Sequence, residues 1–441
     1  MVGGTVVTPE GVFTADVLVL EGRITAIGRG LQTGGVRRID AGGKLVLPGV
    51  IDSHVHMRDP GLTSKEDFHT GTSAAAAGGV TTVLEMPNTL PPVDSVKRFH
   101  EKREILAPKA VVDFGLFAVL HDDDLEEVGE LVKAGAVGFK AFLGPTTGNI
   151  PPPSDGTIFE TLKLLAPLDV TVAFHAENPK MVDFYTARVK AEGRNDPAAH
   201  CAARPPICET EAIARLCFLA EQSCGRVHIV HMSTGEGARI VAAYKAKGAK
   251  VTCETNPQYL LMTETDMRRL GGLGKINPPL RSEEDRLALW KGISSGCVDT
   301  LGSDHAPHLM EEKAAPMIWD VPAGLIGVET LLPLVLDSVN SGRMSIESIA
   351  ALLSRNPAKL FHVDHRKGDI KVGMDGDLAV VDMSESFTIS PERLHSKQRI
   401  SPFGGRSVRG AVKYTVVRGN VVYDGEVRSA AGTWLAPSHA A

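Results

Sequence analysis

Residues 44–61 read KLVLPGVIDSHVHMRDPG, an apolar and largely β-branched run that ends in two histidines separated by one residue. Side chains at positions i and i+2 of a strand point the same way, so His54 and His56 can face one metal ion. An isolated HxH pair is weak support for a metal site, because single histidines are common in cores and on surfaces. The interpretation therefore depends on the strands that follow.

The segment from Val50 to about Val363 repeats this pattern, in which a short apolar run is followed by a longer helix-like stretch. Runs such as VTTVLEM (80–86) and GRVHIVH (225–231) are almost continuously apolar, as expected for strands that are covered on both faces. Alternation of such runs with helices predicts an α/β fold, and eight repeats predict a (β/α)8 TIM barrel. The eight runs end near His56, Glu85, Ala118, Phe142, His175, His231, Glu254 and Asp304.

The two ends of the chain follow a different pattern of short strands joined by Gly and Asp turns without intervening helices. Examples are TADVLVLEGRITAIG (14–28) and RGAVKYTVVRGNVVYDGEV (409–427). We expect these ends to pair as one small composite β-sandwich domain, because a chain that enters and leaves a closed barrel near one place can do so. The predicted domains are residues 1–51 and 366–441 for the two parts of the β domain and 52–365 for the barrel.

Composition narrows the class of protein. The chain has 441 residues, a net charge of −6, 43% hydrophobic residues and 23% charged residues. A nucleic-acid partner is disfavoured, because a protein that binds nucleic acid usually needs a concentrated positive face.

We find no signal peptide and no apolar stretch that could span a bilayer. The six cysteines form no CxxC pair, which is typical of reduced, cytoplasmic proteins. A cytoplasmic small-molecule enzyme without a membrane partner fits best.

Several further side chains that could bind metal lie at or just beyond the predicted strand ends. In a barrel all parallel strands finish at one rim, and active sites form there. The alternative is that each group is an ordinary buried residue, but each would then need its own compensating partner. The predicted metal-ligand set is His54, His56, Lys140, His175, His231 and Asp304.

Lys140 is unusual in this set, because an ammonium group is cationic and has no acceptor. In a desolvated site its pKa would fall, and the neutral amine could react with CO₂ to form an anionic carbamate. Such a group could bridge two divalent ions and allow water between them to become a hydroxide nucleophile. His54, His56 and Asp304 would bind one ion, and His175 and His231 the other. Without the histidines, a structural salt bridge would be the better interpretation of Lys140.

Seven segments distributed along the chain have a characteristic order. Together they resemble the cyclic amidohydrolases of the amidohydrolase superfamily, which include dihydroorotases, allantoinases and hydantoinases. The resemblance implies two divalent metal ions, typically zinc, bridged by an N6-carboxylated Lys140. It also implies that Asp304 is the catalytic residue that transfers the proton. It also implies a homodimer or homotetramer. The segments are PGVIDSHVHMRDPG (48–61), TGTSAAAAGGVTTVLEMPNT (70–89), GAVGFKAF (135–142), FHAE (174–177), HIVHMS (228–233), KINPPLR (275–281) and SDHAPH (303–308).

The sequence contains features of enzymes that act on different ring substrates. Dihydroorotate carries a carboxylate that hydantoins and allantoin lack, so its enzyme needs fixed donors near the metals. The resemblance to dihydroorotases implies that Arg58, Asn88 and His308 bind this carboxylate and that Asn277 contacts the ring. The sequence CETNPQYLLMT (253–263) and the loop EEKAAPMIWDVPAG (311–324) are instead similar to hydantoinases and allantoinases.

We therefore predict a metal-dependent cyclic amide hydrolase that is a dihydroorotase of pyrimidine biosynthesis. The alternatives are a hydantoinase (dihydropyrimidinase) or allantoinase that opens a neutral ring, and a non-catalytic scaffold relative. The residues between His308 and Pro322 are hypothesised to close over the substrate and exclude water.

Overall fold

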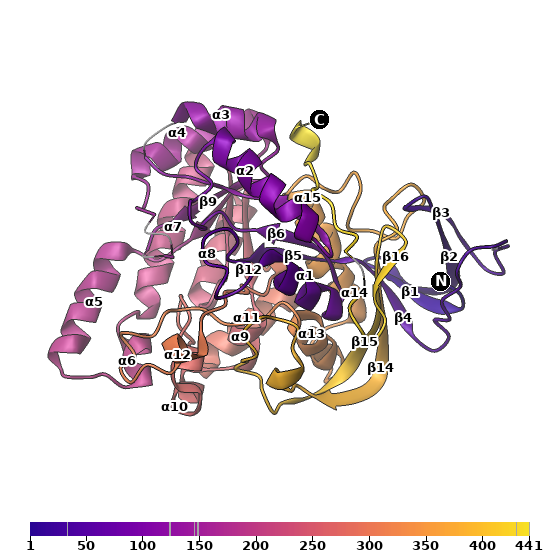
Figure 1. Ribbon diagram of the computed structural model, residues 1–441. Coiled ribbons are helices and arrows are strands. Elements are labelled where there is room, and N and C mark those ends of the chain that lie inside the picture. Colours follow the sequence, from indigo (N-terminus) through magenta and orange to yellow (C-terminus); the bar gives the residue numbers. More distant parts are fainter. Residues whose placement is uncertain (33, 123–124, 145, 148–149, 429, 441) are drawn as a thin grey trace.

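The computed structural model describes residues 1–32, 34–122, 125–144, 146–147, 150–428 and 430–440. Parallel strands occupy the eight predicted positions and form the barrel, which confirms the predicted fold class (Figure 1). The third position is interrupted, so that Asp113–Leu116 pairs with the strand Val80–Glu85 and Ala118–Val119 pairs with the strand Phe139–Phe142. The barrel strands are β5 (Val50–Val55), β6 (Val80–Glu85), β7 (Asp113–Leu116), β8 (Ala118–Val119), β9 (Phe139–Phe142), β10 (Thr171–His175), β11 (Arg226–Ile229), β12 (Val251–Thr255) and β13 (Thr300–Leu301).

The barrel closes where the chain beyond β13 meets the end of β5. Val55 and His305 form a parallel bridge, and the His56 N–H donates to the His305 carbonyl oxygen at 2.7 Å. This contact brings Asp304 beside the HxH pair, although the two lie about 250 positions apart in the chain. Closure of the barrel therefore also assembles the predicted site.

The helices lie outside the strands, and apolar side chains of α1, α4 and α7 belong to the main core. In α1, Asp67 caps the first turn by accepting from the Thr70 N–H, which satisfies one free donor of the helix start. No helix in the described part of the chain is both long and apolar enough to cross a membrane. The helices are α1 (Phe68–Ala77), α2 (Val96–Leu106), α3 (Leu125–Ala134), α4 (Asp155–Leu165), α5 (Pro179–Ala191), α6 (Pro197–Ala202), α7 (Pro206–Ser223), α8 (Gly235–Ala246), α9 (Pro257–Leu261), α10 (Met267–Leu270), α11 (Glu283–Ser294), α12 (Met310–Lys313), α13 (Leu331–Asn340), α14 (Ile346–Ala350) and α15 (Asn356–Leu360).

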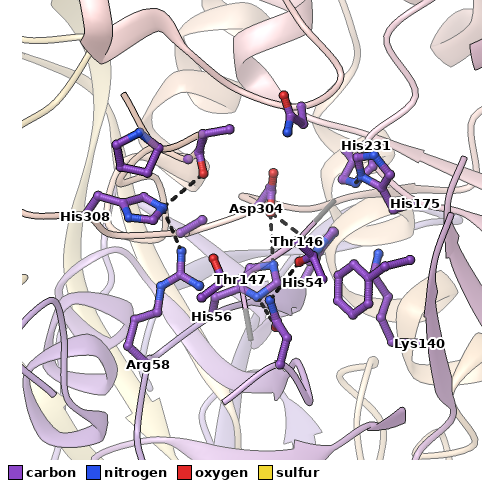
Figure 2. A pocket seen from close by; sticks show the side chains of 17 residues that line it. His54, His56, Arg58, Lys140, Thr146, Thr147, His175, His231, Asp304 and His308 are labelled. Atoms are coloured by element: carbon purple, nitrogen blue, oxygen red, sulfur yellow. Dashed lines mark hydrogen bonds and ion pairs between the residues drawn. The ribbon is translucent and has the colours of Figure 1, made fainter. Parts of the chain in front are cut away.

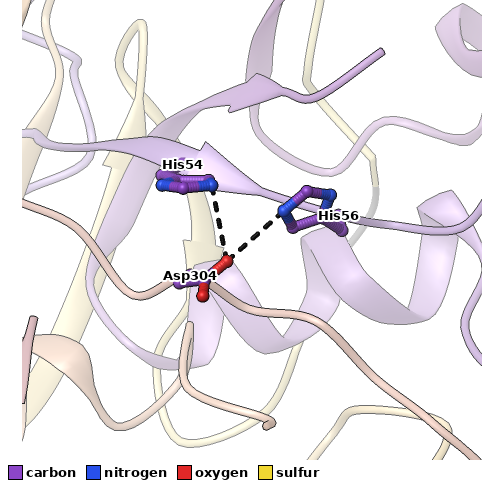
Figure 3. Close-up of side chains that lie close together, drawn as sticks. All are labelled: His54, His56 and Asp304. Carbon is purple, nitrogen blue, oxygen red and sulfur yellow. Dashed lines mark ion pairs between the residues drawn. The ribbon is translucent and has the colours of Figure 1, made fainter. Parts of the chain in front are cut away.

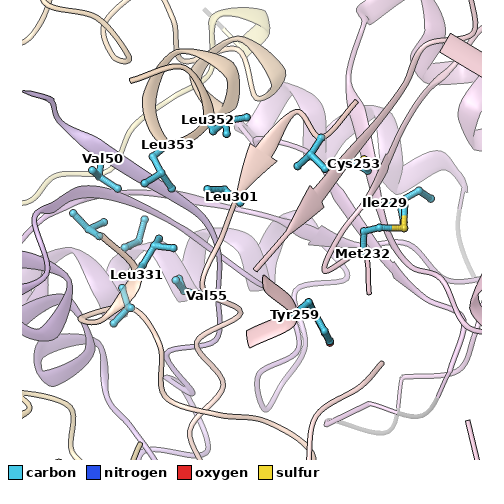
Figure 4. Close-up of a cluster of buried hydrophobic side chains, with 14 of the residues drawn as sticks. Val50, Val55, Ile229, Met232, Cys253, Tyr259, Leu301, Leu331, Leu352 and Leu353 are labelled. Atoms are coloured by element: carbon cyan, nitrogen blue, oxygen red, sulfur yellow. The ribbon is translucent and has the colours of Figure 1, made fainter. Parts of the chain in front are cut away.

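The main hydrophobic core fills the space between the strands and the surrounding helices (Figure 4). Val50 and Leu301 from the strands pack there with Leu331, Leu352 and Leu353 from the helical segments. These side chains are almost completely removed from water, and such burial is the main favourable contribution to folding. The core holds the strands, and therefore the residues at their ends, in fixed positions.

Both ends of the chain contribute to a single β domain, as expected. The N-terminal strand β4 pairs antiparallel with the C-terminal strand β14, which joins the two halves directly. The strand order is β16-β15-β14-β4-β1-β2-β3. The strands are β1 (Gly4–Thr8), β2 (Gly11–Leu20), β3 (Arg23–Gly28), β4 (Leu45–Pro48), β14 (Leu378–Thr388), β15 (Ser407–Val417) and β16 (Asn420–Tyr423).

A buried charge cluster joins the β domain to the barrel. The Lys367 ammonium group forms ion pairs with Asp113 at 2.5 Å, Asp375 at 2.9 Å and Asp377 at 2.5 Å, and Arg418 also pairs with Asp113. The three carboxylates lie close enough together to resemble a metal site. Lys367 already supplies their positive charge, so the cluster is a structural ion network.

Candidate active site

A cavity of about 300 Å³ opens at the carboxyl ends of the barrel strands (Figure 2). Active sites of TIM barrels form at this rim. All the site residues predicted from the sequence line the cavity, so folding brings them together as expected. They are His54, His56, Arg58, Asn88, Lys140, His175, His231, Asn277, Asp304 and His308.

His54, His56 and Asp304 converge on one point (Figure 3). The Asp304 Oδ1 atom lies 3.4 Å from His54 Nε2 and 3.3 Å from His56 Nε2. The three side chains are grouped closely enough to hold a metal ion. Burial lowers the pKa of His56 to about 3, so its ring is neutral and keeps a lone pair available as a ligand.

His175, His231 and Lys140 form the other side of the cavity. The His175 Nδ1 and His231 Nε2 atoms lie 3.0 Å apart, so both rings direct a nitrogen to one place. Lys140 is fully buried, and its Nζ atom has no hydrogen-bond partner among the described residues. Burial lowers the pKa of Lys140 to about 7, which makes the neutral amine accessible. This donor set fits a second divalent ion and a carbamate on Lys140.

Two glutamates orient the histidines from behind. Glu254 Oε1 lies 3.0 Å from His54 Nδ1, and Glu177 Oε2 lies 2.9 Å from His175 Nε2. An ionised carboxylate only accepts, so these ring nitrogens carry the hydrogen and the opposite nitrogens keep their lone pairs. Carboxylates in this position fix the tautomer and raise the basicity of metal-binding histidines.

Asn88 lines the cavity, but its side chain is already engaged. Its Oδ1 atom accepts a hydrogen bond from His56 Nδ1 at 2.7 Å, and its Nδ2 atom donates to Thr146 Oγ1 at 3.3 Å. Asn88 therefore orients His56 in the same way that the two glutamates orient their histidines. Thr146 and Thr147 also line the cavity.

Arg58 and His308 form a positive corner of the cavity. The Arg58 side chain is buried, and no carboxylate in the described ranges forms an ion pair with it. Burial lowers the pKa of Arg58 to about 10, so it remains charged near neutral pH. Burial and the cations Arg58 and Lys65 lower the pKa of His308 to about 2. His308 Nδ1 accepts from Lys65 Nζ at 3.0 Å, and Nε2 donates to the Ala323 carbonyl oxygen at 3.0 Å.

Three of the predicted site residues have left-handed backbone conformations. The φ angles are 60° at Arg58, 42° at His231 and 50° at Asp304. Non-glycine residues rarely adopt this conformation, and such strain concentrates at functional sites. The Asn277 Oδ1 atom is buried and has no hydrogen-bond partner among the described residues, so it is free to bind a ligand.

Sequence reasoning missed the residues that support the site. Glu254 could have been recognised, because it ends a predicted strand as the ligand residues do. Glu177 could have been recognised as well, because it follows His175 by two positions. Lys65 and Thr146 lie in loops with no distinguishing pattern, so their contacts became visible only in the folded chain.

Comparison with known proteins agrees with this geometry. A family model described as "Amidohydrolase family" matches residues 45–422. The chain belongs to the amidohydrolase family. It is 41% identical to an allantoinase of Rubrobacter xylanophilus, with 99% of this chain and 96% of that protein covered. It is 39% identical to a dihydroorotase of Methanothermobacter thermautotrophicus, with 97% and 95% covered.

The structure of an L-hydantoinase (dihydropyrimidinase) from Arthrobacter aurescens superposes on this chain with a TM-score of 0.95. The two are 36% identical, and 99% of this chain and 98% of that chain are covered. Within the amidohydrolase family, the protein thus falls in the group that contains hydantoinases, allantoinases and dihydroorotases. The expected enzyme class, a hydrolase of C–N bonds in cyclic amides, is confirmed.

Proposed function

We propose that this amidohydrolase is a dihydroorotase, which interconverts (S)-dihydroorotate and N-carbamoyl-L-aspartate in pyrimidine biosynthesis. The observation that carries the proposal is the buried Arg58 guanidinium, which faces the cavity beside His308 and has no carboxylate partner among the described residues. With a neutral ring, the Arg58 charge would be favoured only by Glu85, Asp304 and Glu312, none of which pairs with it directly. A ring carboxylate would receive charge-assisted hydrogen bonds from it.

The residues of the cavity fit two divalent ions, for which we propose zinc. His54, His56 and Asp304 would hold one, His175 and His231 the other, and a carboxylated Lys140 would bridge them. When bound, such ions polarise a carbonyl group and lower the pKa of water. The mixed nitrogen and oxygen ligands also accept manganese or cobalt.

Asp304 is proposed to move the proton. Its carboxylate lies at the centre of the ligand group, 3.4 Å from His54 and 3.3 Å from His56. From there it can accept the proton of the attacking water and return it to the departing ring nitrogen. Arg58 would hold the substrate carboxylate, with Asn88 and His308 beside it in the cavity, and Asn277 would contact the ring. These contacts would place the scissile amide against the ligand group.

The second candidate is a hydantoinase or allantoinase, which the similar proteins support equally well at 36–41% identity. Of the sequence features that favour it, Pro322, Ala323 and Gly324 of the 311–324 loop line the cavity, whereas three distinctive side chains lie outside it. Gln258 donates to the Ser303 carbonyl, Tyr259 to the Pro278 carbonyl, and Trp319 to Arg194 and Asn195. None of the three side chains lines the cavity, so they act on the ring only indirectly.

Turnover of dihydroorotate, a 5-substituted hydantoin and allantoin by the zinc-loaded protein tests the proposal. We expect hydrolysis or synthesis only for the dihydroorotate pair. In that case Arg58→Ala should raise KM for dihydroorotate by about 100-fold, because a charge-assisted bond to a buried ion contributes about 2–3 kcal/mol. Turnover of either neutral ring without turnover of dihydroorotate would overturn the proposal.

A further inference from the structure

Residues 309–324, here called the cover segment, pass from α12 back to the cavity, where Pro322, Ala323 and Gly324 form part of its wall. Residues of this segment, Ile318 and Val321, pack on Val189 and Ala199 in a separate small apolar cluster. The cover segment is therefore packed against α5 and α6.

Lys313 contacts the backbone of Pro322 and Gly324 at the end of the cover segment. The residue is 4% exposed, and its Nζ atom donates to the carbonyl oxygens of Lys275 at 3.1 Å, Pro322 at 3.0 Å and Gly324 at 2.8 Å. When protonated, Lys313 uses all three of its donors in these bonds, and no carboxylate among the described residues pairs with it. A buried lysine that bonds only to carbonyls orders the backbone around it, since each lost bond would leave a buried acceptor unpaired.

A second buried lysine fastens the middle of the cover segment. The Lys275 Nζ atom donates to the carbonyl oxygen of Ile318 at 2.6 Å, and the Gly324 N–H donates to the Lys275 carbonyl at 2.9 Å. Trp319 donates through Nε1 to the carbonyl of Arg194 at 2.9 Å, outside the cavity. The cover segment is therefore fixed at several points, of which the Lys313 contacts and the bond between Gly324 and Lys275 lie at the cavity wall.

The two carbonyls held by Lys313 flank Ala323, whose own carbonyl accepts from His308 Nε2 at 3.0 Å. His308 in turn lies 3.3 Å from Arg58 Nη2. We propose that Lys313 is a positioning residue that sets the Ala323 carbonyl and, through it, the orientation of His308 beside Arg58. This inference rests on the proposed function where it concerns an anionic substrate, but the arrangement of the cover segment does not depend on the substrate.

The test compares Lys313→Met and Lys313→Gln with the unchanged protein, each loaded with zinc. Methionine fills the space without donors, whereas glutamine keeps part of the donor capacity. We expect amide hydrogen exchange in residues 318–324 to rise strongly in the methionine variant and less in the glutamine variant. For dihydroorotate, KM should rise by about tenfold with kcat nearly unchanged, as expected when one orienting hydrogen bond is lost. Bound zinc should not change.

Lys245→Met is the matched control, because Lys245 donates to the Cys297 carbonyl and to Asp299 away from the cavity. It should alter neither KM nor exchange in residues 318–324. A purely structural role of Lys313 would lower the active fraction, and hence apparent kcat, at constant KM, which would overturn the inference. Unchanged amide hydrogen exchange of residues 318–324 in Lys313→Met would also overturn the inference. If the methionine variant does not fold, fast amide hydrogen exchange of Ala323 and Gly324 in the unchanged protein would contradict the proposal.

If dihydroorotate is not turned over, the proposed function fails separately. The exchange measurement still decides whether Lys313 holds the cover segment.

Discussion

At the scale of single residues, the candidate ligands His54, His56 and His175 each have one ring nitrogen committed to a side-chain oxygen. The partners are Glu254, Asn88 and Glu177. Each contact leaves the opposite nitrogen as a lone-pair donor toward the cavity. The two carboxylates also stabilise positive charge on their rings, whereas the neutral amide of Asn88 only orients His56. The side chains of Glu254, Asn88 and Glu177 therefore influence how strongly each ring can bind a metal.

Replacing Glu254 by glutamine should weaken metal binding by about 10- to 100-fold, because the partner of His54 would lose its negative charge while keeping its size. Competition with a chelator for bound zinc measures this directly. Asp16→Asn is a suitable control, since Asp16 accepts from the Gly3 and Leu31 amides in the β domain. Equal zinc affinity of Glu254→Gln and the unchanged protein would contradict a role for Glu254 in orienting His54.

At the scale of secondary-structure elements, the short helix α9 positions the segment that carries Asn277. The Tyr259 hydroxyl is buried and donates to the Pro278 carbonyl at 2.6 Å, next to Asn277 in the chain. Tyr259→Phe would leave this carbonyl without its donor. We expect a loss of about 1 kcal/mol in the free energy of unfolding and a several-fold rise in KM. Urea denaturation and steady-state kinetics measure the two effects.

Tyr244→Phe, on the outer helix α8, controls for loss of a tyrosine hydroxyl, since Tyr244 is not among the described residues that line the cavity. It should leave KM unchanged. If Tyr259→Phe destabilises the protein without altering KM, then α9 supports the fold but does not position Asn277.

The elements differ in how well the sequence predicted them. His54 and His56 were predictable because a strand places residues i and i+2 on the same side, and β5 does end there. The convergence of distant strand ends followed from the symmetry of the barrel. The contact of Asn88 with His56 and that of Lys65 with His308 were not predictable, because they depend on side-chain orientation in loops. Local periodicity contains no information on such contacts.

At the scale of the whole molecule, the barrel and the β domain are joined by the ion network around Lys367. Lys367→Met would leave Asp113, Asp375 and Asp377 buried together without their shared cation. Breaking a buried pair in this way costs about 3–5 kcal/mol. We expect a correspondingly lower denaturant midpoint, whereas Lys371→Met, at an exposed lysine, should change stability by less than about 0.5 kcal/mol. Similar midpoints for the two variants would show that the network contributes little.

A second contact between the two domains should make stability depend on pH. His395 follows β14 and donates through its N–H and Nδ1 to Glu329 of the barrel at 2.8 and 3.0 Å. The hydrogen bond to Glu329 raises the pKa of His395 above its usual value of about 6.5. The folded protein therefore binds this proton more tightly than the unfolded chain does. The stabilisation is fully present below about pH 6.5 and is lost as the pH rises through the folded pKa.

His395→Gln should accordingly destabilise the protein more at pH 5.5 than at pH 8.5. We expect the two losses to differ by about 0.5–1 kcal/mol, the usual contribution of a partly exposed ion pair. Urea denaturation of zinc-loaded protein at both pH values measures the difference. His69→Gln is the control, because His69 contacts the Lys109 carbonyl rather than a carboxylate. An equal loss at both pH values would mean that His395 holds the domains together through its neutral hydrogen bonds, with no contribution from its charge.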